Sequence, residues 1–380
     1  MMNSGEMNSA RRSAFTFALS LVLLVAASGK TAADSDQTSA ERGSFFKRYD
    51  VRVPHNAASC SECHAIPGPG GSSHVIVFRA GSGFRKASDE SPDGASGSLR
   101  SRNDIGGARI PLSAFGDAYI EAIPDKELLE LAEREAMETR GQIQGQATIV
   151  SVLEAGPGTK AIGRFGWKAQ HATLLSASAD ALRHELGVPN EFFPLSEGLA
   201  NGKNREKRIN QTTDADLVSM IRFLRSLQPI PRDPVQSATE ASREGLAIFD
   251  KIGCSVCHVR TLTTAAAGTR MYGGTLVVSR QIGDKEIHPY SDFLLHNVGT
   301  GDGIAENIRP QDYDPRTLNK FRTPPLWGLR YRVWMMHDGK AVTYHQAIMR
   351  HGGEAAEVVR RYLRLTPVER EDLMEFLNSL

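Results

Sequence analysis

Cys254-Ser255-Val256-Cys257-His258 is the stretch that decides how this chain folds, and its pattern occurs far upstream as Cys60-Ser61-Glu62-Cys63-His64. Cys-x-x-Cys-His is the attachment pattern for c-type haem. On a helical turn the two thiols and the imidazole lie on one face. Both thiols can then bond to one porphyrin while the imidazole binds its iron. The two motifs therefore predict two covalently bound haem c groups, with His64 and His258 as iron ligands.

Two other uses of paired cysteines compete with this interpretation. A zinc ribbon also has two Cys-x-x-Cys pairs, but they normally lie about 15–20 residues apart, whereas most of the chain separates these two. A thioredoxin-like dithiol needs one pair and no histidine after it. The chain has 4 cysteines, and the two motifs use all of them. Haem attachment is therefore the favoured role of Cys60, Cys63, Cys254 and Cys257.

Charge and length exclude few classes of protein. The chain has 45 basic and 44 acidic side chains, a net charge of +1. A nucleic-acid-binding protein would show a basic excess, so no nucleic-acid partner is expected. Its 380 residues suffice for two domains.

The first 33 residues have the pattern of a secretory signal peptide. Arg11 and Arg12 precede an apolar run over residues 15–27, and Thr31-Ala32-Ala33 offers a cleavage site. The run is short for a membrane span, although an uncleaved anchor is the alternative. Haem is attached to this motif outside the cytoplasm, so the sequence predicts a periplasmic protein with no membrane association after cleavage.

Apolar periodicity predicts a mainly α chain. We expect helices over 124–140, with Leu128, Leu129 and Leu131 on the buried side, and over 172–185, 213–227 and 241–251. Thr366, Pro367 and Glu369 predict the start of a last helix through an N-cap, an N1 proline and a capping box. The Gly-, Ser- and Arg-rich residues 80–107 are interpreted as a long surface loop.

The two halves share one plan. A proline-rich segment, 228–234, is typical of a stiff linker between two domains. The first half closes with Phe223-Leu224-Arg225-Ser226-Leu227 and the second with Phe376-Leu377-Asn378-Ser379-Leu380. We therefore expect two tandem cytochrome c-like domains, 34–232 and 233–380, the first with long loop insertions.

Three further blocks carry a family resemblance: residues 110–116, residues 163–169, and the long block 321–355 that contains His337-Asp338-Gly339 and His351-Gly352-Gly353-Glu354-Ala355. With both haem motifs, residues 50–380 resemble the bacterial di-haem oxidoreductases, relatives of di-haem cytochrome c peroxidase and the MauG-type enzymes. The resemblance implies a periplasmic oxidoreductase that reduces hydrogen peroxide at the first haem. Electrons would pass through the second haem from a small redox protein or a protein substrate.

The resemblance also assigns residues around the second haem. His351 matches the position of its distal ligand, where peroxidase relatives have methionine, and bis-histidine ligation lowers the potential. His337 is implied to line this haem, although a structural histidine is the alternative. Trp167 matches a tryptophan that lies between the two haems, although it could equally be a core residue. The resemblance also implies the calcium ion found in relatives. The sequence does not reveal its ligands, because they are mostly backbone carbonyls.

At the first haem, Glu185 matches the glutamate that moves a proton during peroxide cleavage; a solvated glutamate at a helix end is the alternative. His184 is adjacent, and His55 or His74 could cap the iron. A non-catalytic di-haem electron-transfer cytochrome, or a di-haem oxygenase, stays open as a second and third function. The spin state of each iron separates an enzyme from a carrier.

Overall fold

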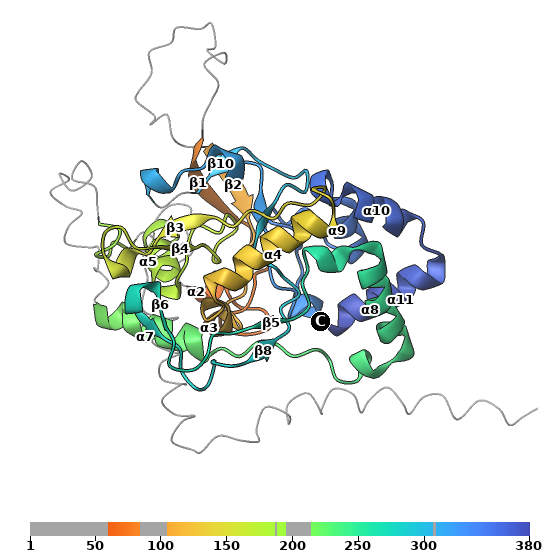
Figure 1. Ribbon diagram of the computed structural model, residues 1–380, viewed down its shortest axis with the longest axis horizontal. Helices are drawn as coiled ribbons and strands as arrows, with labels where there is room; N and C mark the ends of the chain where they lie inside the picture. The colour runs from red at the N-terminus through yellow and green to blue at the C-terminus, as the bar shows by residue number, and fades with distance from the viewer. Residues whose placement is uncertain (1–59, 84–104, 187, 195–213, 307–308) are drawn as a thin grey trace, which may run out of the picture. The chain divides into compact units, whose positions relative to one another are not determined.

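The computed structural model describes residues 60–83, 105–186, 188–194, 214–306 and 309–380 (Figure 1). These residues all belong to one unit, Phe45–Leu380. The predicted signal peptide and His55 lie outside the described residues. The predicted domain boundary at 232/233 stays a prediction.

Regular structure in this part of the chain is mainly helical, as expected, and the strands are few and short. The helices are α2 Cys60–Cys63, α3 Asp117–Glu121, α4 Asp125–Glu138, α5 Leu174–His184, α7 Asp214–Ser226, α8 Glu240–Ile252, α9 Tyr344–Met349, α10 Ala356–Leu363 and α11 Pro367–Ser379. The strands are β1 Val77–Gly83, β2 Ile105–Arg109, β3 Ile149–Ser151, β4 Lys160–Ile162, β5 Leu262–Thr263, β6 Arg270–Met271, β7 Leu276–Val277, β8 Glu286–Ile287, β9 Leu295–His296, β10 Ile304–Ala305 and β11 Phe321–Arg322.

Side-chain caps fix where the main helices begin. Thr173 and Thr239 accept hydrogen bonds from the first-turn backbone of α5 and α8. Thr366 and Glu369 form the predicted capping box of α11. One detail of the helix prediction is wrong: Leu129 is 45% exposed, because α4 buries only a narrow stripe through Leu128 and Leu131.

The segment interpreted as a surface loop over 80–107 begins and ends in strands. β1 pairs antiparallel with β2, and β10 pairs with β1 at its other edge (Figure 1). The glycines and alternating polar residues hide these strands from a periodicity argument. The backbone hydrogen bonds between β1 and β10 cannot be predicted from the local sequence of β1. Residues 84–104 lie outside the described part of the chain.

Two hydrophobic cores hold the helices. The first joins α4, α5 and α7 through Leu131, Leu182 and Ile221, and also includes Phe293 and Leu294 from beyond the proline-rich segment. The second joins α8 and α11 to residues 329–365. None of the described helices is both long enough and apolar enough to cross a lipid bilayer.

A buried lysine ties the two halves of the chain together. The Lys168 ammonium donates to the backbone carbonyls of Leu318 and Lys320, both at 2.9 Å, and lies 3.8 Å from the centroid of the Phe321 ring. Burial lowers the pKa of Lys168 to about 8. The loop 163–169 is therefore fixed against the segment 317–321.

Helices α8 and α11 cross at a glycine. A Cβ atom on Gly245 would lie 1.9 Å from the Asp372 carbonyl oxygen and 2.8 Å from the Phe376 Cβ. Only hydrogen at this position lets the two backbones approach so closely. The closing helix α11 thus packs on α8, the helix that runs into the second haem motif (Figure 1).

The Gly245→Ala variant should therefore lose stability, although alanine is the better helix former by about 1 kcal/mol. We expect overpacking to lower the free energy of unfolding by about 1–3 kcal/mol, measured by urea denaturation of the holoprotein. Glu244→Ala, an exposed change on the same helix, should stay within about 0.5 kcal/mol. A Gly245→Ala protein as stable as the parent would show that the crossing can relax.

Candidate functional site

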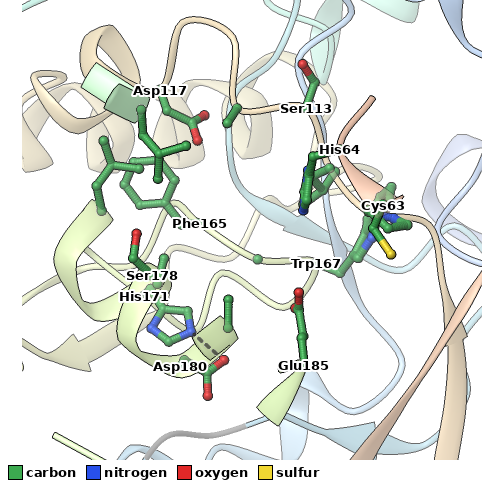
Figure 2. Close-up of a pocket in the computed structure, with 18 of the residues that line it drawn as sticks. Cys63, His64, Ser113, Asp117, Phe165, Trp167, His171, Ser178, Asp180 and Glu185 are labelled. Carbon is green, nitrogen blue, oxygen red and sulfur yellow. Dashed lines mark hydrogen bonds and ion pairs between the residues drawn. The ribbon is translucent and has the colours of Figure 1, made fainter. Parts of the chain in front are cut away.

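The first Cys-x-x-Cys-His motif opens onto a cavity of about 310 Å³, cavity 1 (Figure 2). Helix α2 places Cys60, Cys63 and His64 along one side. The residues lining the rest of the wall are mostly apolar, with a set of ionisable side chains among them. That set consists of Asp117, His171, Asp180, His184, Glu185, Arg109, Glu306 and Arg322. In Figure 2 the Glu185 carboxylate points into the space below His64.

The second motif lines a separate cavity of about 190 Å³, cavity 2. A 3₁₀ turn, Cys254–Val256, follows α8 and brings Cys254, Cys257 and His258 to the cavity wall. His351, just after α9, lines the same cavity, and its ring centroid is 6.4 Å from that of His258. The remaining lining residues are largely apolar, and α8, α9, α10 and α11 supply many of them.

The imidazoles of the three predicted iron ligands are anchored alike. Each Nδ1 lies within hydrogen-bond distance of a backbone carbonyl: His64 to Gly71 at 3.0 Å, His258 to Tyr290 at 3.0 Å, and His351 to Ala347 at 2.7 Å. A carbonyl can only accept, so Nδ1 carries the hydrogen and Nε2 presents a lone pair. Metal-binding histidines are usually oriented in this way.

The two imidazoles of cavity 2 fit a single metal ion between them. Two bonds of about 2.0 Å, plus the offset of each nitrogen from its ring centre, require ring centroids about 6 Å apart, and the observed value is 6.4 Å. Burial lowers the pKa of His258 to about 4 and also lowers that of His351. Both rings are therefore neutral, the form in which imidazole binds a metal.

The four thiols fit haem attachment better than they fit a zinc site. Burial raises the pKa of Cys60 and Cys254 to about 12 and that of Cys257 to about 11; the charge of Glu185 adds to the effect on Cys60. The two pairs also line different cavities, and all four cysteines are free. The zinc-ribbon alternative has no shared site.

Trp167 lies in the wall that both cavities share. It is buried, and its indole N–H donates to the Ile110 carbonyl at 2.7 Å. Its ring meets those of Phe321 and His337 edge-on, with centroids 6.5 and 6.3 Å away. His337 stacks on Phe321 at 3.6 Å and lines cavity 2. Trp167 therefore lines both cavities and His337 lines cavity 2, and their roles stay predictions.

Arg322 also lines both cavities, and the sequence did not single it out. Its Nε donates to the Gly166 carbonyl at 2.7 Å, whereas its buried Nη1 has no hydrogen-bond partner among the described residues. Burial lowers its pKa to about 10. A buried guanidinium with a free donor suits an anionic group, such as a haem propionate carboxylate.

Three more ionisable residues that line cavity 1 were not predicted from the sequence. Burial raises the pKa of Asp117 to about 7, despite the charge of Arg322. His171 and Asp180 form a buried pair at 3.1 Å (Figure 2). His171 lies just before α5 and Asp180 lies within it, and the helical pattern alone does not predict that they pair. His74, predicted as a possible cap, is exposed and does not line this cavity.

Beside cavity 2, His296 lies between two carboxylates. Its Nε2 is 2.9 Å from Asp292 and its Nδ1 is 3.0 Å from Glu354. It also lies 3.8 Å from the Cys257 sulfur. The geometry of Cys257, Asp292 and His296 could hold a metal ion. Because Cys257 belongs to the haem motif, we interpret the group as support for that thiol.

Comparison with known proteins gives the chain its family. Residues 77–380 match the family described as "Di-haem oxidoreductase, putative peroxidase". The curated protein "Cytochrome-c peroxidase IdrP1" of Denitromonas iodatirespirans is 28% identical over 163 residues, which are 39% of this chain and 42% of that protein. The match thus spans less than half of that relative's length.

Two solved structures resemble the fold loosely. Hydrazine synthase of Kuenenia stuttgartiensis is 16% identical with a TM-score of 0.45, over 91% of this chain and 88% of that one. The dihaem peroxidase BthA of Burkholderia thailandensis is 15% identical with a TM-score of 0.40, over 90% and 86%. The family match covers most of the chain. The protein therefore belongs to the di-haem oxidoreductase family, whose description implies two haem groups and peroxide as a substrate.

Proposed function

We propose that this protein is a periplasmic di-haem c oxidoreductase of the peroxidase type, built from two tandem cytochrome c-like domains. Hydrogen peroxide is reduced at cavity 1, with electrons that enter through cavity 2. The main support for this proposal is that the two cavities differ in their histidines. Cavity 2 has two facing imidazoles, whereas in cavity 1 the imidazoles of His171 and His184 are both bonded to Asp180.

The residues present would hold the haems as follows. Cys60 and Cys63 form thioethers in cavity 1, where His64 binds the iron. In cavity 2, Cys254 and Cys257 would form the thioethers, and His258 and His351 would bind the iron. When bound, haem supplies reversible electron storage and an iron at which peroxide binds and its O–O bond breaks. A bis-histidine site favours electron transfer, and a site with one histidine stays open to substrate.

Peroxide reduction consumes two protons and two electrons and releases two water molecules. One protein group must move a proton from the inner to the outer peroxide oxygen. Glu185 supports this role, because it follows α5 directly and lines the cavity that contains His64. A carboxylate can take up and return a proton without leaving its place.

Trp167 and His337 support an electron path between the cavities. Trp167 is hydrogen-bonded to Ile110, whose own N–H donates to the His337 carbonyl at 2.8 Å. Aromatic rings also meet along this path. We assign delivery of single electrons to a small redox protein or a protein substrate. The signal peptide pattern supports the periplasm, and calcium stays a prediction from family resemblance.

Spin state tests the assignment of the two cavities. The oxidised holoprotein should show one high-spin and one low-spin haem by electron paramagnetic resonance. His351→Ala should convert the low-spin signal to high spin, because it removes one of two imidazole ligands. His345→Ala is the matched control, since His345 lies in α9 but bonds to the Tyr362 hydroxyl. Two low-spin haems in the parent would instead indicate an electron carrier.

Glu185→Gln tests the proton-transfer role. The substitution keeps the shape of the side chain and removes its ability to take up a proton. We expect peroxide turnover to fall about 10²- to 10⁴-fold, with both haem spectra unchanged. Glu191→Gln, an exposed change that does not line cavity 1, should leave turnover unaltered. Full activity in Glu185→Gln would remove this residue from the mechanism.

A further inference from the structure

We propose that His171, Asp180 and His184 form a proton relay that connects cavity 1 with bulk solvent. This inference rests on the proposed peroxide reduction, which consumes protons inside the cavity. A single glutamate can pass a proton between two oxygens, but it cannot supply the two protons that each turnover consumes. Most of the other residues that line cavity 1 are apolar, so a route for replacement protons runs through its polar groups.

The three side chains form a continuous chain of hydrogen bonds. One oxygen of Asp180 lies 3.1 Å from His171 Nε2, and the other lies 2.6 Å from His184 Nδ1. All three residues line cavity 1, and Figure 2 shows the His171–Asp180 pair on its wall. Because the carboxylate uses separate oxygens for the two rings, it can accept a proton on one side and release one on the other.

Solvent exposure increases along the hydrogen-bonded series from His171 to His184. The side chain of His171 is 2% exposed, that of Asp180 is 6% exposed and that of His184 is 51% exposed. The relay thus begins at the cavity wall and ends in water. The outer ring is also held in place, since it meets Phe193 edge-on with centroids 5.6 Å apart.

Helix α5 brings the relay to the proposed proton-moving group. Asp180 and His184 are four residues apart, so they share one face of the helix. Glu185 follows His184 in the chain and lines the same cavity. Imidazole gains and loses protons readily near neutral pH, and carboxylates exchange protons with it through hydrogen bonds. Replacement protons therefore reach the wall of cavity 1, which His171 and Glu185 both line.

A purely structural network is the competing explanation, because His171 precedes α5 and its bond to Asp180 also holds the helix. The exposed end separates the two explanations. Removing His184 leaves the buried His171–Asp180 pair intact, so a structural role predicts little change. A relay predicts slower proton supply and, in addition, recovery when a small diffusible base replaces the missing ring.

His184→Ala therefore gives the main test. We expect peroxide turnover by the holoprotein, with an artificial one-electron donor, to fall about tenfold or more and the solvent deuterium isotope effect to rise. Added imidazole should restore most of the rate. His288→Ala is the matched control: His288 is 59% exposed and lies 3.8 Å from Glu286, but it does not line cavity 1. It should change neither quantity.

Cyanide binding gives a readout that does not require turnover. Hydrogen cyanide releases a proton when cyanide binds to an oxidised haem, so the protein must carry that proton away. Asp180→Asn and His184→Ala should slow the binding, followed by optical spectroscopy, while the His288→Ala rate matches the parent. Equal rates in all variants, or no rescue by imidazole, would overturn the relay alone. No cyanide binding by the parent would overturn the proposed open site as well.

Discussion

The hydrogen bond between each candidate ligand imidazole and a backbone carbonyl is the constraint on which the two cavities depend. Without it, each ring could turn and present either nitrogen. The acceptor for His258 is the carbonyl of Tyr290, a residue held at φ 52°, which is a left-handed conformation that few side chains adopt. The fold accepts local strain there, and the loop after the second motif thereby fixes the tautomer of its histidine.

The wall between the cavities also depends on segments that lie far apart in the sequence. The loop 163–169 supplies Trp167, and β11 supplies Arg322. The Arg322 backbone N–H donates to the Trp167 carbonyl at 2.8 Å, while its guanidinium bonds to Gly166. A change in either segment therefore reaches both cavities. This shared wall brings Trp167 and Arg322 to both cavities, although the two Cys-x-x-Cys-His motifs lie far apart in the sequence.

The sequence predicted what depends on local chemistry. Cys254, Cys257 and His258 lie on one short turn, so their spacing alone indicates their task, and the capping box of α11 is equally local. Long-range contacts left no such signal. The strand β1 at the start of 80–107 pairs with β10, which lies far along the chain. Leu129 shows the remaining difficulty, because periodicity cannot tell how wide a stripe of α4 is covered.

The pairing of β1 with β10 has a consequence for how the polypeptide matures. Because β1 and β10 lie far apart in the sequence, one edge of β1 has no native partner until residues 304–305 reach it during folding. An open strand edge readily joins a second chain. The carbonyl groups of Leu318 and Lys320, which accept hydrogen bonds from the Lys168 ammonium, also lie late in the sequence. A chain that ends before β10 would therefore leave this edge of β1 open and would tend to aggregate.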